Sequence, residues 1–252
     1  MSLDLNDLLR DWPHEPGQLK VRKILGSDGK EKLQLRMDLG LIQMETTGRP
    51  DGTRPDGFES LLEYHQDQAR RMEKKDEKYI LDPEAVGDIQ QEGIQYYHRY
   101  ISFFQLGDYA AVIRATQRNL EKFRFVEEHT DNEDLAEAVI QFTPYVLMMS
   151  TRAHASIEVE REDFAAAVRE IEQGIAKVRA FHEEHGSPES LEQSPEVAFL
   201  QEWLEEVRSK QPVTKLEKMQ REMDKAIQSE AYERAAELRD QIQRYMQKKG
   251  QR

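Results

Sequence analysis

Apolar and polar side chains alternate between residues 18 and 47, and such alternation is typical of β-strands with one buried face. Two glycine-containing breaks, Gly26–Gly29 and Gly40, divide this segment into three runs. The second run places four apolar side chains on one face: Leu33, Leu35, Met37 and Leu39. The pattern predicts a three-stranded antiparallel β-meander. Because three short strands are only marginally stable alone, we expect the sheet to pack against a helix.

From Gly57 onward the apolar residues recur every three or four positions, which is the period of an amphipathic helix. A charged helix is predicted from Phe58 to Lys78. A second is predicted to begin after the N-cap residue Asp82, with Pro83 at its first position, and to end near Gly107. The same period continues in a segment that begins near residue 133 and is interrupted by Pro144, and again in residues 195–209.

The middle of the chain contains a weak internal repeat, in which residues 106–129 resemble residues 160–185. Tyr109 aligns with Phe164, and an alanine-rich helix follows each of them. An acidic-aromatic turn that leads into an alanine-rich helix is typical of tetratricopeptide-type units, because small residues let helices cross closely. The copies lie further apart than in a regular array, so we expect a divergent helical-hairpin (TPR-like) body.

Residues 215–246 contain two short amphipathic segments separated by a break near Ser229 and Glu230. Their apolar stripes are Leu216, Met219, Met223 and Ile227 in the first, and Ala235, Leu238, Ile242 and Tyr245 in the second. Two such stripes joined by a few residues predict an antiparallel helical hairpin. The small side chains of Ala226, Ala235 and Ala236 are expected to let the two backbones approach closely.

Part of this segment also resembles a known module. The residues that match are Tyr232-Glu233-Arg234-Ala235-Ala236 and Leu238-Arg239-Asp240, together with Leu216, Met219, Ala226 and Ile242. The string resembles the UVR motif, the C-terminal helical hairpin of the excision-repair proteins UvrB and UvrC, which also occurs in adaptor proteins of Clp protease systems. The resemblance covers about the last sixth of the chain. It implies a docking module that pairs with another protein.

The same resemblance implies which residues contact the partner: Met219, Met223, Tyr232, Arg234, Leu238, Arg239 and Asp240. The apolar members have an alternative role, which is to hold the two helices of the hairpin together. A generic charged hairpin without a docking role is the competing interpretation of the whole segment.

These patterns predict a mainly α protein with three parts. Residues 1–57 form an N-terminal arm and a small β-sheet with a turn loop. Residues 58–211 form the helical-repeat-like body, and residues 212–252 form the hairpin. The break at Gln211-Pro212 marks the second boundary.

Composition excludes several classes of protein. The net charge of −13 argues against a general nucleic-acid binder, although the last 38 residues carry ten Lys and Arg against seven Asp and Glu. No apolar run is long enough to cross a membrane, and the N-terminus lacks a secretory signal. The chain has no cysteine, which excludes disulfides and thiol catalysis and is compatible with the cytoplasm.

A tandem turn sequence follows the predicted sheet, with Arg49-Pro-Asp-Gly52 and Arg54-Pro-Asp-Gly57 in succession. Pro, Asp and Gly suit successive positions of β-turns. Each turn presents one arginine, so Arg49 and Arg54 are candidates for contact with an anion or a peptide carboxylate. The alternative is a plain connector between sheet and helix.

The chain carries no motif for catalysis or for a cofactor. Phosphate-cradling loops and nucleophile elbows are absent from the sequence. His182 and His185 share one helical face, but they fit a helix C-terminus better than a metal site. The aromatic cluster formed by Tyr96, Tyr97, Tyr100, Phe103 and Phe104 fits packing better than base stacking. We therefore expect no enzyme activity, no metal and no cofactor.

Three functions remain open. The first is a cytoplasmic, non-enzymatic adaptor whose hairpin docks on a Clp-type AAA+ chaperone, on a UvrB- or UvrC-like protein, or on a second copy of the chain. The second is an accessory of nucleotide excision repair that contacts those repair proteins or DNA. The third is an enzyme or small-ligand receptor with a site near Arg49 and Arg54. A polar pocket that joins the sheet, this loop and the tyrosine cluster would favour the third.

Overall fold

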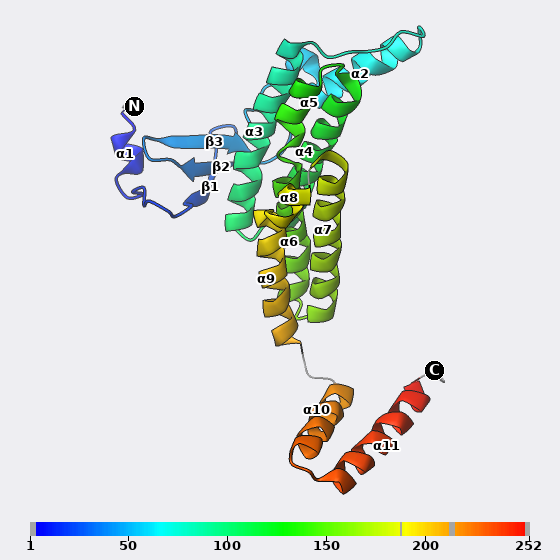
Figure 1. Ribbon diagram of the computed structural model, residues 1–252. Coiled ribbons are helices and arrows are strands. Elements are labelled where there is room, and N and C mark those ends of the chain that lie inside the picture. The colour runs from blue at the N-terminus through cyan, green and yellow to red at the C-terminus, as the bar shows by residue number, and fades with distance from the viewer. Residues whose placement is uncertain (1–3, 187, 212–214, 250–252) are drawn as a thin grey trace. The chain divides into compact units, whose positions relative to one another are not determined.

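The computed structural model describes residues 4–186, 188–211 and 215–249 (Figure 1). The chain divides into two compact units, Met1–Arg208 and Ser209–Arg252. The structure is mainly helical, with a small antiparallel sheet near the N-terminus and a C-terminal helix pair, as the sequence predicted. The predicted boundary at residue 212 lies outside the described residues.

The N-terminal part of the first unit is a short helix and a three-stranded meander. Helix α1 spans Asn6–Leu9, and strands β1 (Val21–Leu25), β2 (Glu31–Arg36) and β3 (Leu41–Glu45) pair in sequence order. Both pairs are antiparallel. Leu33, Leu35 and Met44 join the same buried cluster as the aromatic residues of helix α3 (Pro83–Gln105), and the sheet lies beside that helix in Figure 1. The expectation that the sheet packs on a helix is therefore confirmed.

Strand β2 differs from its predicted pattern at its end and on its polar face. It ends at Arg36, so Met37 and Leu39 lie in the turn before β3, where Leu39 is 93% exposed. Lys32 and Gln34 are buried although they are polar. Lys32 is paired with Asp28 and Glu45, and Gln34 is hydrogen-bonded to Arg22 and Gln43 on the neighbouring strands. Each of these buried polar groups has a polar partner, which makes its burial tolerable. The second face of β2 is therefore covered by the protein although its side chains are polar.

Helices α2 (Leu61–Glu73) and α3 (Pro83–Gln105) begin at polar caps. The Ser60 hydroxyl accepts from the Glu63 N–H, and the Asp82 carboxylate accepts from the Ala85 N–H, as the sequence predicted for Asp82. Helix α2 does not reach Lys78. Asp76 adopts a φ of 58°, and the Glu77 N–H donates to the Met72 carbonyl, which closes the helix in the left-handed manner common at C-termini.

Two helices of the body begin in the same way, at the places where the sequence repeats. Helix α4 (Tyr109–His129) and helix α7 (Phe164–His185) each follow an aspartate whose side chain accepts from the N–H three residues later. The residue before each aspartate has a positive φ, 73° at Gly107 and 59° at Glu162. The repeated acidic-aromatic sequence thus specifies a repeated turn.

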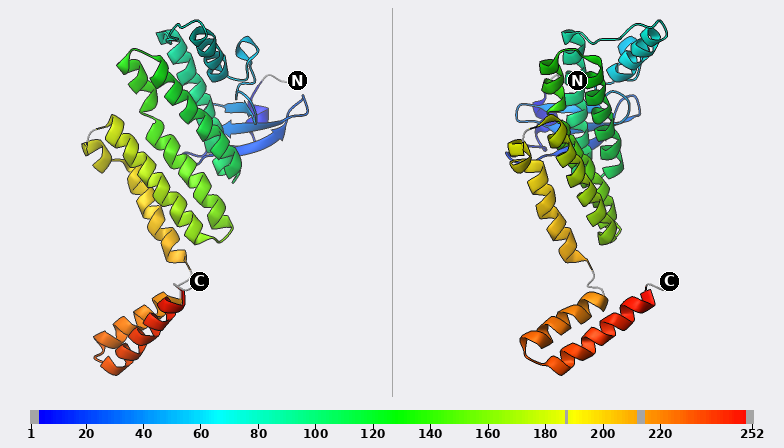
Figure 2. Two further views of the ribbon diagram at one scale, coloured as in Figure 1. Left: turned by 90° about the vertical axis from the view of Figure 1, so that its right-hand side faces the viewer. Right: turned by 45° about the vertical axis from the view of Figure 1, so that its right-hand side comes forward.

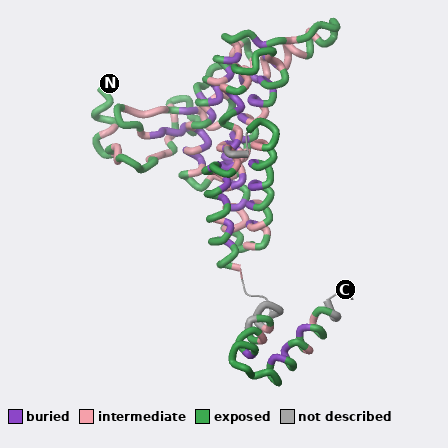
Figure 3. The backbone as a smooth tube through the Cα atoms, viewed as in Figure 1, coloured by how far each residue is buried: buried purple, intermediate pink, exposed green. Residues whose placement is uncertain are grey.

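The remaining helices of the first unit complete a stack that Figure 2 shows from two sides. They are α5 (Glu133–Ile140), α6 (Thr143–Glu160), α8 (Pro188–Glu192) and α9 (Pro195–Lys210). Pro144 lies in the first turn of α6, so the proline separates α5 from α6, where its missing N–H is tolerated. The buried residues of the sheet and of the helices of the first unit form one continuous core (Figure 3).

The second unit consists of α10 (Lys215–Gln228) and α11 (Tyr232–Lys249), which pack together as the predicted hairpin. Glu230, with a φ of 58°, occupies the break between them. The predicted break near Ser229 and Glu230 is therefore correct.

Helices α6 and α7 approach so closely at Gly174 that no side chain fits there. A Cβ atom at this position would lie 2.7 Å from the Thr151 Cβ, so rotating the threonine cannot relieve the clash. We expect Gly174→Ala to lower the free energy of unfolding by about 1–3 kcal/mol, because the helices must separate. Urea denaturation followed by circular dichroism measures the change.

Gly87 is the matched control, since it is an exposed helical glycine of α3 with open space around its Cβ position. Gly87→Ala should raise the free energy of unfolding by about 0.5–1 kcal/mol through helix propensity alone. Equal effects of the two substitutions would show that the α6–α7 approach is not close.

Candidate functional site

The hairpin has a thin apolar interior. Ala226, Ala235, Leu238 and Ile242 are buried between its helices, and Met219, Met223 and Tyr245 are half-buried beside them. Two of the predicted interior residues lie elsewhere, since Ala236 is exposed and Ile227 is about half exposed. The register explains this: each is adjacent in sequence to a buried alanine, so it points to a neighbouring face of its helix. The side chain of Leu216 lies outside the described residues.

The structure divides the predicted partner-contacting residues into two groups. Tyr232, which is 66% exposed, and the side chains of Arg234 and Arg239 are open to solvent. Leu238 is only 2% exposed and is held in the interior, so its position fits the alternative role of joining the helices. The half-buried Met219 and Met223 lie along the edge of that interior.

The charged members of the group are already engaged within the hairpin. Arg234 pairs with Glu237 at 2.9 Å and lies 3.9 Å from Glu222 on the other helix. Arg239 pairs with Asp240 at 2.8 Å. Such exposed pairs contribute little to stability and exchange readily for pairs with another molecule. These pairs therefore leave both arginines available for contact with another molecule.

One face of α11 combines exposed apolar and basic residues at helical spacing: Tyr232, Ala236, Arg239, Gln243 and Met246. Tyrosine, methionine and arginine are the side chains that protein interfaces favour. We call this face the α11 stripe. It lies beside the buried row at Ala235, Leu238 and Ile242, so its exposed side chains lie outside the interior of the hairpin.

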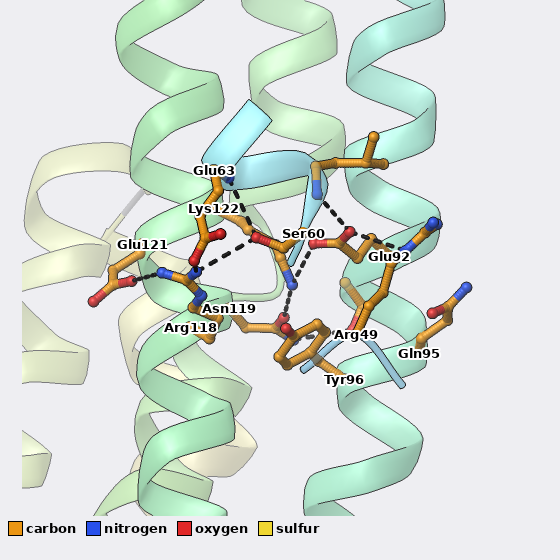
Figure 4. A network of polar contacts seen from close by, with 12 residues as sticks. Arg49, Ser60, Glu63, Glu92, Gln95, Tyr96, Arg118, Asn119, Glu121 and Lys122 are labelled. Carbon is orange, nitrogen blue, oxygen red and sulfur yellow. Dashed lines mark hydrogen bonds and ion pairs between the residues drawn. The ribbon is translucent and has the colours of Figure 1, made fainter. Parts of the chain in front are cut away.

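The first unit contains a second polar constellation, centred on the fully buried carboxylate of Glu92 in α3 (Figure 4). One carboxylate oxygen accepts from the Leu61 N–H at 2.8 Å and lies 3.1 Å from the Arg49 Nε. The other lies 3.2 Å from the Nζ of Lys122 in α4. The contacts to Arg49 and Lys122 are ion pairs without hydrogen-bond alignment. A buried charge is tolerated only when it is paired in this way.

Lys122 is itself fully buried, and its surroundings disfavour its charge. The ammonium lies 3.2 Å from the centroid of the Tyr96 ring and 3.4 Å from the Asn119 amide oxygen. Burial lowers the pKa of Lys122 to about 7, although Glu92 opposes the shift, and Arg99 and Arg118 add to it. Near pH 7 Lys122 is therefore divided between its charged and neutral forms, and Arg49 is the more permanent counter-charge of Glu92.

The two turn arginines have different environments. Both turns form, with N–H donation from Gly52 to the Arg49 carbonyl at 3.0 Å and from Gly57 to the Arg54 carbonyl at 3.2 Å. Arg49 is directed inward to Glu92 and also donates to the Thr53 hydroxyl. Arg54 is exposed and lies 3.7 Å from Glu59. Of the two, only Arg54 presents its guanidinium to the solvent.

Other arginines line a cavity of about 360 Å³ next to this network. It lies between the loop at residues 46–48 and one face each of α3 and α4. Arg99 of α3 and Arg114 and Arg118 of α4 contribute to its wall. The cavity joins the end of the sheet to Tyr96 of the tyrosine cluster, while Arg49 is not among the residues that line it.

Sequence analysis missed Glu92, Lys122 and the arginine cavity, although a signal was present. Glu92 lies at helical spacing from the buried Ile89 and Tyr96, and Lys122 lies at helical spacing from the buried Ala115 and Val126. A charged residue in register with a buried stripe indicates a buried ion pair. The tyrosine cluster was interpreted correctly in part, since Tyr96, Tyr100 and Phe103 are buried in the core.

The two neighbouring histidines lie in the last turn of α7, where His185 faces Glu127 at 3.5 Å and His182 faces Ser190 at 3.4 Å. Among the residues that the structure describes, no three His, Asp or Glu side chains are grouped so as to hold a metal ion. Nor does that part of the chain contain a helix long and apolar enough to cross a membrane.

Comparison with known proteins identifies the second unit. Residues 214–247 match the family model described as the UvrB/uvrC motif, which is known from nucleotide-excision-repair proteins and mediates protein interactions. The resemblance noted in the sequence is therefore confirmed for the hairpin. No curated protein and no solved structure matches the chain.

The lowered pKa of Lys122 predicts a pH dependence of stability. Between about pH 7 and the ordinary value of 10.5, the unfolded chain holds a proton that folded Lys122 releases. Stability therefore rises with pH in this window, by about 1.4 kcal/mol per pH unit at most. The free energy of unfolding, from urea titrations at pH 7 to about 9.5, measures the slope.

Lys122→Met removes the titrating group and keeps the volume of the side chain. The difference in unfolding free energy between wild type and this variant should grow with pH in favour of the wild type. A difference that stays constant across the window would show that Lys122 keeps an ordinary pKa.

Proposed function

We propose that the protein is a non-enzymatic adaptor that docks on another protein through its C-terminal hairpin. The match of residues 214–247 to the UvrB/uvrC motif carries this proposal. The α11 stripe supports it, because Tyr232 and Met246 are large apolar side chains that the hairpin leaves exposed. Buried Leu238 and Ile242 keep the hairpin folded while the stripe remains available.

The size of the hairpin limits the interface. Helix α11 has 18 residues, and a helix of that length extends about 27 Å. One face of it buries on the order of 1,200 Å² or less in total, which is typical of weak and transient complexes. Such binding suits an adaptor that delivers and releases a partner. The proposed partners are a Clp-type AAA+ chaperone, a UvrB- or UvrC-like protein, or a second copy of this hairpin.

A role as a repair accessory that contacts DNA is the second candidate, because the matched motif is known from repair proteins. The net charge of −13 weighs against it. A titration with duplex DNA at low salt separates the two. Binding that weakens steeply with added salt favours contact with DNA, and no binding favours the adaptor.

The docking proposal predicts that the α11 stripe determines which proteins the full-length chain retains. Tyr232→Ala combined with Arg239→Ala removes the exposed aromatic ring and the neighbouring cation without touching the buried row. We expect the affinity for the partner to fall at least about tenfold, since exposed Tyr and Arg are common hot spots. Quantitative affinity capture from the source cell, followed by titration of the captured protein, measures the change.

Phe142→Ala is the matched control, because Phe142 is an exposed aromatic residue of the first unit. It should leave capture unchanged. A chain that ends at Gln211 should lose the same partners as the double variant, and sedimentation of wild type and double variant tests pairing between copies. If the double variant and the shortened chain both retain every partner, the hairpin is not the docking module.

A further inference from the structure

The arginine cavity beside the Glu92 network belongs to the first unit and not to the hairpin, and its chemistry indicates a ligand. Its polar wall is formed by Thr46, Thr47 and Gly48 of the loop after β3 and by Arg99, Arg114 and Arg118 of the two helices. Glu59, at the start of the α2 region, is the one acidic residue among the described residues that line it. Three arginines thus line one hollow in a chain whose net charge is −13.

The hollow exists because α4 presents small and basic residues on one face. Ala111 and Ala115, one turn apart, are buried at the floor of the cavity and leave space above them. Arg114 and Arg118, also one turn apart, line the same space. Tyr96, Arg99 and Phe103 supply the facing wall from α3. The helical register of two neighbouring helices therefore builds both the space and its charge.

Two of the three arginines are held rigidly. Arg99 is 6% exposed, lies with its Cζ 4.4 Å from the centroid of the Tyr96 ring, and donates to the Gly48 carbonyl at 2.7 Å. Its Nε is buried without a hydrogen-bond acceptor among the described residues. Arg118 is paired with Glu63 and lies 3.3 Å from Glu121. Arginines fixed in this way lose little conformational freedom when they bind an anion.

The third arginine lacks such partners. Arg114 is exposed, and its guanidinium has no hydrogen bond or ion pair with any residue that the structure describes. Its charge nevertheless acts on Arg99, whose pKa is lowered mainly by burial and in part by Arg114. Bringing like charges together costs free energy that an anion between them would recover.

We propose that this cavity binds the oxyanion group of a small molecule, either a phosphate or a carboxylate. Guanidinium groups form paired hydrogen bonds to both kinds of group, and the hydroxyl of Thr47 is a further donor at the rim, whereas the Thr46 hydroxyl donates to the Glu31 carbonyl at 3.2 Å. The volume of about 360 Å³ is within the range of small-molecule sites and leaves room for more of the ligand than the anion alone. The site is separate from the proposed docking surface, since all of its residues belong to the first unit.

Isothermal titration calorimetry of the full-length protein at low salt tests the proposal, with pyrophosphate and citrate as probes. Saturable binding of at least one probe at a ratio of one per chain is expected. Stronger binding of pyrophosphate identifies a phosphate ligand, and stronger binding of citrate identifies a carboxylate ligand. If neither probe binds, the proposal is wrong.

Substitutions assign the binding to the cavity. Arg114→Gln should weaken the binding of the preferred probe about tenfold. Because the Arg114 guanidinium has no partner among the described residues, we expect this substitution to leave folding unchanged. Arg124→Gln is the matched control, because Arg124 is an exposed arginine on the same helix that does not line the cavity. Equal affinities of these two variants would overturn the proposal.

Glu59→Gln provides a change in the opposite direction. Removing the acidic residue of the wall should tighten binding about twofold, and a damaged protein would not show such a gain. Arg118→Gln should weaken binding as Arg114→Gln does, with circular dichroism to confirm that the fold is kept after the loss of the Glu63 pair. Unchanged affinity in both Glu59→Gln and Arg118→Gln would place the bound probe elsewhere on the surface.

Discussion

The architecture of the first unit depends on neutralising one carboxylate. Glu92 is fully buried, and its partners come from the turn after the sheet, from the first residue of α2 and from α4. An ionised carboxylate in the interior is strongly unfavourable unless these partners are in place. Segments that are distant in the sequence are thus required to meet at one point. The apolar core supplies most of the driving force, and this ion network selects the arrangement.

Local chemistry made a large part of the fold predictable. The alternation of residues 18–47 yielded the meander, Asp82-Pro83 yielded the start of α3, and the paired stripes of residues 215–246 yielded the hairpin. These features depend on neighbours along the chain. The end of α2 was not predicted, because the left-handed residue that closes the helix is Asp76 rather than a glycine. The charged residues on either side of Asp76 are equally compatible with a longer helix.

The polar interior of the first unit was the part that sequence alone did not reveal. Lys32, Glu92 and Lys122 are charged, and such side chains are mostly exposed in proteins. Their burial depends on partners supplied by other elements, such as Glu45 for Lys32 and Arg49 for Glu92. The cavity depends on the same tertiary pairing, since its arginines come from two helices and its rim comes from a loop. For α11 the sequence did not reveal which side chains are exposed, since Leu238, predicted to contact a partner, is buried, and Ala236, predicted to lie between the helices, is exposed.

The loop at residues 46–49 adds polar contacts to the apolar packing of the small sheet against the helices. Tyr96 and Arg99 donate to the Gly48 carbonyl, and Arg49 reaches Glu92. If the sheet detached, a buried negative charge would lose its permanent counter-ion inside the helical stack. Partial melting of the N-terminal strands is therefore penalised, and the first unit is expected to unfold in a single cooperative step rather than to fray from its smallest layer.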